Sequence, residues 1–134
     1  MPGLADPERA VLTVYGRLPL MITENCLVQN SVGCRLDRQG RCVPAQAPCA
    51  QGHTLVDRTG AAFPLLPAWS HRTEVQNSRP LWLADRPDWK RLGLAYARLR
   101  FTTESPAECV EGFRSSLSGA SAKGEFTGGL YERG

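Results

Sequence analysis

The sequence predicts an α/β fold, and three observations support that prediction. The stretch LAYARLRF at residues 94–101 alternates its side chains between two faces, which is typical of a strand. A helix is predicted directly after it, because Ser105 can cap a helix and Pro106 suits the first turn. The apolar side chains of that helix recur at helical spacing, at Val110, Phe113 and Leu117. Near the N-terminus, VLTVYGRLPLMIT predicts strands at Val11–Tyr15 and Pro19–Thr23.

The middle of the chain predicts further extended segments. The turn signal DRTG lies between two apolar runs and indicates a β-hairpin within residues 53–84. Two more short extended runs flank the turn signal NSRP. Residues 85–93 read as a helical segment, with Asp85 as a cap and Gly93 at its end.

Residues 24–52 show no periodicity and contain four of the five cysteines. A loop this long inside a compact domain needs something to organise it. Bound metal would do so. The stretch is therefore expected to be a Cys-rich loop held by a metal.

With 134 residues, the chain is expected to form one domain. A closed barrel of eight strand–helix units needs about 250 residues, so the chain has room for only about two such units plus a β-rich insert. We expect a single partial domain over 1–134, divided into a strand region (11–23), a Cys-rich loop (24–52), a hairpin and extended region (53–84), and a helix–strand–helix region with a Gly-rich tail (85–134).

A formal net charge of +3 is compatible with an anionic partner without requiring one. The apolar runs are far shorter than a membrane span, so no membrane association is expected. The N-terminus does not resemble a secretory signal, because acids at Asp6 and Glu8 stand where such signals are positively charged. The expected location is the cytoplasm, where clustered thiols are more often metal ligands than disulfides.

The clustered thiols are Cys26, Cys34, Cys42 and Cys49, spaced C-x7-C-x7-C-x6-C. This spacing lacks the close pairs of zinc fingers. Thiolates select zinc, copper(I) or iron–sulfur centres. The alternative is that these cysteines bind no metal and are simply small buried side chains.

Other polar residues have structural as well as functional interpretations. Cys109 lies in the predicted last helix and is expected to be a core residue. Arg17 and Arg100 could bind a carboxylate or phosphate, or else form an internal salt bridge. Glu104 is one of several acid/base candidates whose burial the sequence does not reveal. His53 is expected to be polar surface.

Five motifs occur in order along residues 11–134: VYGRLPLMIT followed by Cys26, DRTGAAFPLLP, HRTEVQNSRPLWLAD, RLRFTTESP and FTGGLYERG. Together they resemble the C-terminal portion of peptidase family U32, the collagenase-like peptidases. The barrel-forming N-terminal part of that family has no counterpart here. The resemblance implies the C-terminal part of a TIM-barrel-like fold with a Cys-rich, hairpin-containing insert.

The resemblance also implies a ligand set. Some members of the family are similar to proteins that hold an iron–sulfur cluster with four cysteines. Matched by motif, Cys26, Cys34 and Cys49 correspond to three of those ligands. His71 stands where the family has its fourth cysteine, and Cys42 competes for that place. A histidine can replace a cysteine on iron, as in Rieske centres. The expected cofactor is a 4Fe-4S cluster, with zinc or no metal as alternatives.

Three functions follow from the resemblance. The first is a hydrolase, a collagenase-like protease portion with a metal or iron–sulfur site. The second is an iron–sulfur-dependent, oxygen-independent hydroxylation component that acts on RNA or on a ubiquinone precursor. The third is a non-catalytic fragment or partner subunit that needs a barrel-half partner chain. The substrate, whether protein, peptide or RNA, and the catalytic residues stay unassigned.

Overall fold

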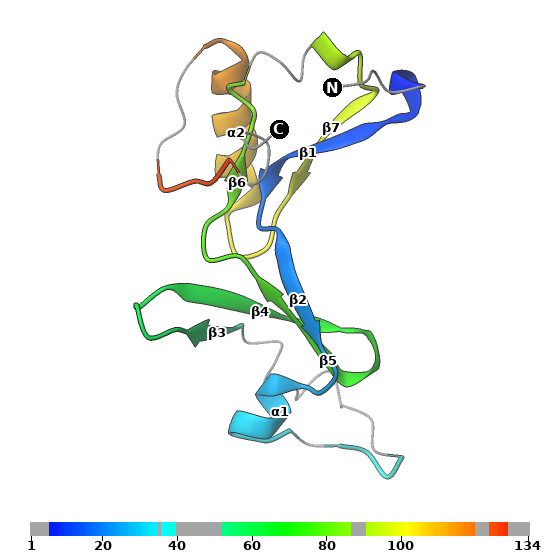
Figure 1. The fold of residues 1–134 in the computed structure, drawn as a ribbon, viewed down its shortest axis with the longest axis vertical. Helices are drawn as coiled ribbons and strands as arrows, with labels where there is room; N and C mark the ends of the chain where they lie inside the picture. The colour runs from blue at the N-terminus through cyan, green and yellow to red at the C-terminus, as the bar shows by residue number, and fades with distance from the viewer. Residues whose placement is uncertain (1–5, 35, 40–51, 87–90, 120–123, 129–134) are drawn as a thin grey trace. The chain divides into compact units, whose positions relative to one another are not determined.

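A computed structural model describes residues 6–34, 36–39, 52–86, 91–119 and 124–128 (Figure 1). Over these residues the chain is mostly β-structure, with seven strands in two sheets and two short α-helices. The chain divides into two compact units: unit 1 is Met1–Arg17 with Arg79–Gly134, and unit 2 is Leu18–Ser78.

The predicted α/β, TIM-barrel-like fold is wrong. Such a fold needs repeated parallel strands joined by helices, and the described chain has one parallel strand pair, β1 (Val11–Gly16) with β7 (Tyr96–Arg100). Every other strand pair between named strands is antiparallel. Unit 2 and β6 separate β1 from β7 in the sequence, so this pair is not an ordinary strand–helix–strand unit.

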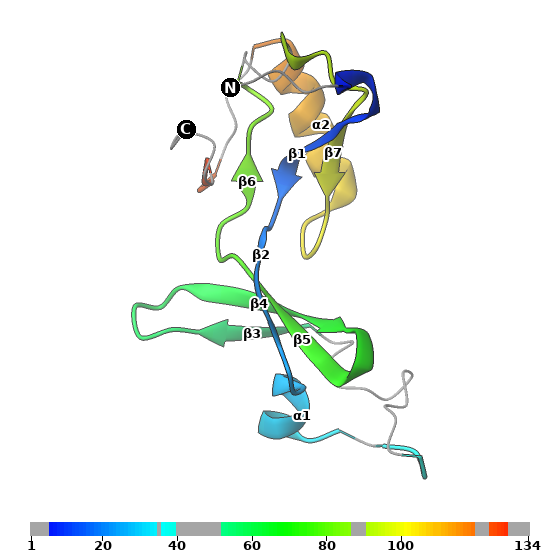
Figure 2. The same ribbon diagram turned by 45° about the vertical axis from the view of Figure 1, so that its right-hand side comes forward.

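Unit 1 contains a three-stranded sheet in the order β6-β1-β7, and β6 is Leu81–Trp82 (Figure 2). A 3-10 turn at Pro7–Arg9 leads into β1. The helix α2, Pro106–Leu117, follows β7 and lies against the sheet. It begins at Pro106, as predicted, with Ser105 at the N-cap position, but the Ser105 side chain makes no capping hydrogen bond. Four of the nine residues of the helix expected over 85–93, residues 87–90, lie outside the described ones, so the structure does not test this helix as a whole.

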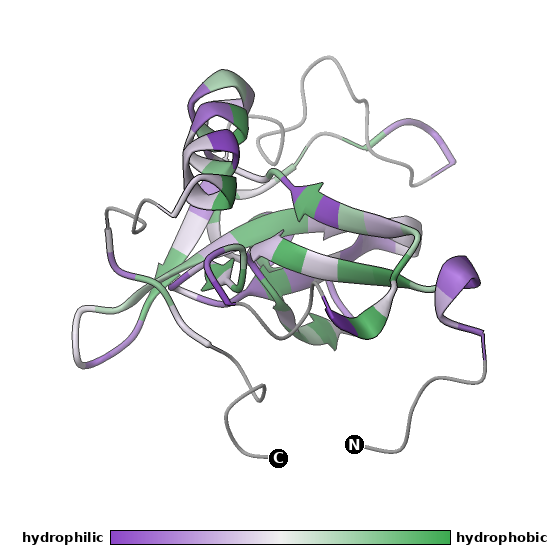
Figure 3. Ribbon diagram, turned by 90° about the horizontal axis from the view of Figure 1, so that it is seen from above, coloured by the Kyte–Doolittle hydropathy of each residue, from purple (hydrophilic) through white to green (hydrophobic). Residues whose placement is uncertain are grey.

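The core of unit 1 is aromatic. Tyr15 and Trp82 meet edge to face with ring centroids 5.6 Å apart, and Phe126 lies 5.1 Å from Trp82. The helix α2 contributes Cys109 and Phe113 to this cluster. Figure 3 shows hydrophilic and hydrophobic positions alternating around α2, as expected of a helix with one face on a core.

Unit 2 contains a four-stranded antiparallel sheet in the order β2-β5-β4-β3. Its strands are β2 (Pro19–Thr23), β3 (His53–Val56), β4 (Ala62–Ala68) and β5 (Arg72–Gln76). The hairpin predicted at DRTG is present as β3–β4. Asp57 fixes its turn, because one carboxylate oxygen accepts hydrogen bonds from the backbone of Thr59 and of Ala61, at 2.8 and 3.0 Å.

The helix α1, Leu27–Val32, lies against one face of this sheet (Figures 1 and 2). No hydrophobic periodicity over residues 24–52 predicts this helix. A helix of six residues is unstable alone, so its contacts with the sheet must hold it. Cys26 and Val28 pack against Leu65 of β4 and Val75 of β5, and this cluster is the core of unit 2.

Within the part of the chain that the structure describes, no helix is long and apolar enough to cross a membrane.

Candidate metal centre

Cys26 occupies the N-cap position of α1. Its side chain is nearly buried, and its Sγ accepts a hydrogen bond from the backbone N–H of Gln29 at 3.4 Å. Backbone N–H groups aimed at sulfur are a common feature of thiolate metal sites, where they tune the ligand. The same hydrogen bond is the N-cap of α1, so it fits a ligand and a purely structural cysteine equally. A cysteine packed as a small hydrophobe would also be buried in this way.

Two threonines fix the segment that carries Cys26. The backbone N–H of Leu27 donates to Thr73 Oγ1 at 3.0 Å. Thr23 Oγ1 donates to the Thr73 carbonyl and accepts from the Thr73 N–H, both at 3.2 Å. Thr73 is 1% exposed. These bonds start α1 at Cys26 and hold it to the beginning of β5. Neither threonine could be singled out from the sequence, because both look like ordinary strand residues.

His71 is the last residue of the short connection between β4, which ends at Ala68, and β5, which begins at Arg72. Ser70 and His71 both have positive φ, at 61° and 59°. This left-handed conformation costs about 1–2 kcal/mol for a residue with a side chain. The next residue, Arg72, pairs with Glu24 at 3.0 Å.

The pairing of β2 with β5 brings the segments of Cys26 and His71 together. Thr23 is opposite Thr73 in the antiparallel register. The chain leaving β2 toward Cys26 therefore passes the chain that enters β5 from His71. Two predicted ligands that are distant in the sequence reach the same end of one strand pair.

The remaining predicted ligands are only partly described. Cys34 follows Gly33, the C-cap of α1, and is half-buried. Cys42 and Cys49 lie outside the described residues. Among the residues that are described, no group of three or more histidine, cysteine or acidic side chains is arranged to hold a metal ion. The donor set nevertheless suits a soft metal, because thiolates with an imidazole are ligands of zinc and of iron–sulfur centres.

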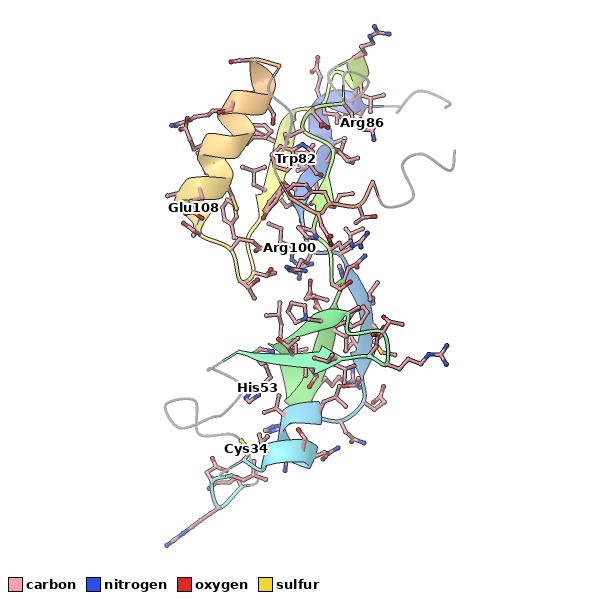
Figure 4. All side chains as sticks on the ribbon, turned by 90° about the vertical axis from the view of Figure 1, so that its left-hand side faces the viewer. Cys34, His53, Trp82, Arg86, Arg100 and Glu108 are labelled. Atoms are coloured by element: carbon pink, nitrogen blue, oxygen red, sulfur yellow. The ribbon has the colours of Figure 1, made fainter. Side chains whose placement is uncertain are left out.

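His53 is less exposed than the sequence suggested, since it was expected to be polar surface. It begins β3 and is half-buried. Its cross-strand partner is Leu65, which packs in the cluster with Cys26. Directly opposite residues project to the same side of a sheet, so His53 is on the α1 side. Figure 4 labels Cys34 and His53, both in unit 2.

Cys109, in unit 1, is not part of this group. Its Sγ donates to the Tyr15 hydroxyl at 3.3 Å, and its side chain packs on the aromatic core. Burial, followed by this hydrogen bond, raises the pKa of Tyr15 well above its ordinary value. The expectation that Cys109 is a core residue is confirmed.

Unit 1 holds a second polar group, centred on Glu104. Arg17 Nε donates to Glu104 Oε1 at 3.1 Å, and both side chains are 16% exposed. Glu104 Oε2 accepts from the Thr102 N–H, the Thr102 hydroxyl and the Thr103 N–H, at 2.9–3.0 Å. The salt-bridge interpretation of Arg17 is confirmed. Burial opposes ionisation of Glu104, but these hydrogen bonds outweigh it and lower its pKa. A carboxylate held ionised in this way is poorly suited to act as a general acid.

The hydrogen bonds that Glu104 accepts from Arg17, Thr102 and Thr103 predict that the folded state of unit 1 loses stability in acid. A carboxyl whose folded pKa is lowered stabilises the protein above its unfolded pKa, near 4.5, and this contribution is lost as pH falls through the lower folded value. Glu104→Gln should cost about 2 kcal/mol at pH 7 and flatten the loss of stability below pH 4.5. Urea unfolding followed by tryptophan fluorescence at several pH values measures both effects. Glu108→Gln, on the exposed first turn of α2, is the control. If the free energy of unfolding of Glu104→Gln depended on pH as in the wild-type protein, these hydrogen bonds would not be the cause of the acid sensitivity.

No family model matches this chain, and neither a curated protein nor a solved structure matches it. The resemblance to family U32 therefore stays a prediction from the five ordered motifs.

Proposed function

We propose that the chain is the C-terminal portion of a peptidase of the U32 type, and that unit 2 contains a metal centre. The ligands are Cys26, Cys34, Cys49 and His71, with Cys42 as the competitor of His71. The observation that carries the proposal is the β2–β5 pairing, which brings the segment of Cys26 beside that of His71. The metal is an iron–sulfur cluster or zinc, both of which thiolates select.

The chemistry of the donor set indicates what the metal does. Four protein ligands leave no open position for water or substrate, which is the pattern of a structural rather than a hydrolytic site. The centre would therefore fasten the Cys-rich segment to the sheet. Peptide hydrolysis would depend on other residues, and the peptidase assignment rests on the motifs alone.

Metal analysis of anaerobically purified full-length protein, with a visible spectrum, tests the proposal. Absorption near ~400 nm with bound iron indicates a cluster, and colourless protein with stoichiometric zinc indicates a zinc site. We expect Cys26→Ala and Cys34→Ala to lose the metal, because each removes a ligand. His71→Ala and Cys42→Ala should differ, and the one that loses metal identifies the fourth ligand.

The matched control is Cys109→Ala, which removes a thiol that lies in unit 1. It should retain the metal. Full metal retention in both Cys26→Ala and Cys34→Ala, or wild-type protein with neither iron nor zinc, would exclude the proposed centre.

A further inference from the structure

The strand β2 forms one edge of the four-stranded sheet of unit 2 (Figure 1). It pairs with β5 on its inner side, and no other described strand pairs with its outer side. The backbone of an edge strand presents a row of N–H and C=O groups on its outer side that another strand can bind.

The side chains of β2 are apolar and exposed. Leu20, Met21 and Ile22 are 54%, 57% and 58% exposed. Met21 is opposite Val75, a residue of the unit 2 core, and therefore projects to the side of that core. Ile22 projects to the other side, because successive side chains of a strand alternate. An exposed apolar edge strand of this kind is a surface on which another strand readily pairs.

The edges of the sheet in unit 1 differ from β2. The edge strand β7 carries Arg98 and Arg100, and the other edge strand, β6, has only two residues. Charged side chains and very short strands are features that protect a sheet edge from pairing. The sequence has no charged residue between Arg17 and Glu24, so β2 lacks both kinds of protection.

We propose that β2 binds β2 of a second copy of this chain, with the two strands antiparallel across a two-fold axis at Met21. A two-fold contact of this kind uses the same surface on both copies, so the surface must be complementary to itself. In this register Met21 is opposite its own copy, and Leu20 is opposite Ile22 of the other copy. All three exposed side chains therefore meet apolar partners. Glu24, an exposed charge next to the strand, is opposite Leu18 of the other copy and meets no like charge.

The paired segment is short, which predicts a weak dimer. Pro19 has no N–H to donate, and a β-bulge between Pro19 and Met21 interrupts the regular strand. Contacts that bury less than about 1,200 Å² are typical of weak and transient complexes. We therefore expect a reversible dimer that forms at high protein concentration.

Sedimentation velocity of the full chain, over a concentration series that reaches millimolar protein, tests the proposal. We expect a monomer–dimer equilibrium. Met21→Lys should weaken dimerisation at least about tenfold, because it places two ammonium groups opposite each other at the axis. Met21→Leu keeps an apolar side chain and should dimerise like the wild-type protein.

The matched control is Val56→Lys, which introduces the same charge at an exposed apolar residue of β3, the opposite edge of the same sheet. It should leave the dissociation constant of the dimer unchanged. Neither lysine variant removes a proposed metal ligand, so dimerisation and metal retention are measured independently.

Met21→Cys gives a second measurement, which decides if Met21→Lys fails to fold. Directly opposite residues of antiparallel strands are close enough for a disulfide. Mild oxidation should therefore link position 21 of the two copies, and mass spectrometry of a non-reduced digest identifies that link.

Four results would overturn the proposal. The first is a monomer at every concentration, and the second is an equal effect of Met21→Lys and Val56→Lys on dimerisation. The third is assembly beyond the dimer, which would indicate open-ended pairing of β2 with β3 of the next copy. The fourth is the absence of a disulfide between the two copies of position 21 in oxidised Met21→Cys protein.

Discussion

Gly16→Ala is expected to destabilise unit 1 by about 4 kcal/mol, which is a large part of the stability of a small domain. Gly16 has φ +132°, a conformation that side-chain-bearing residues rarely adopt. Strain of this kind costs on the order of 1–3 kcal/mol. The new Cβ would also press on the backbone of Arg100, at 2.4 Å from its oxygen. Forcing an extra carbon into a tight contact adds about 1–3 kcal/mol.

The measurement is urea unfolding followed by fluorescence of Trp82, in a background with Trp69→Phe and Trp89→Phe. Trp82 is buried in the core of unit 1 and so reports on this unit. Gly119→Ala is the matched control, since Gly119 also has positive φ, +94°, but none of the described residues has an atom within 4 Å of its added Cβ. It should cost about 1–2 kcal/mol. Similar losses in the two variants would mean that the close approach of β1 and β7 contributes nothing.

Local sequence patterns predicted the elements that depend on local interactions. The strand Pro19–Thr23 has the predicted bounds, and α2 begins after Ser105 as its cap and proline indicated. The hairpin at DRTG is also present, because Asp57 closes that turn with its own backbone neighbours. In each case the residues that determine the structure lie within a few positions of one another.

The pairing of strands could not be predicted in the same way. The sequence placed a turn between the runs that became β5 and β6, yet these strands belong to different sheets. The predicted α/β fold was extrapolated from one strand–helix succession, β7 followed by α2. The partner of β7 is β1, which lies near the N-terminus. A local sequence pattern cannot predict pairing between strands so distant in the sequence.

The candidate site also combines features that local sequence predicts with features that depend on long-range contacts. The sequence identifies which residues can be ligands, because thiols and imidazoles are recognisable by type. It does not show that α1 forms after Cys26, because that helix depends on the hydrogen bond from Leu27 to Thr73. The burial of Glu104 likewise depends on Arg17, which is distant in the sequence.

If unit 2 holds the proposed metal, removal of that metal is expected to lower the amide protection of unit 2 about a thousandfold while leaving unit 1 unchanged. A metal present at a thousand times its dissociation constant stabilises the folded state by about 4 kcal/mol, and unprotected amides exchange faster by the corresponding factor. The reporter amides are those of α1 and β5, for example Asn30, whose N–H donates to the Cys26 carbonyl at 3.1 Å. The comparison amides are those of β1 and β7.

Hydrogen exchange with and without a chelator, on protein purified anaerobically, measures this difference. The six-residue α1 should lose protection first, because it depends on its contacts with the sheet and has little stability of its own. Cys26→Ala protein should exchange at the metal-free rate and show no response to the chelator, since it lacks a ligand. A chelator response of equal size in Cys26→Ala and wild-type protein would place the metal elsewhere. Equal changes in both units would show that the metal stabilises the whole chain and not the segment around Cys26 and His71.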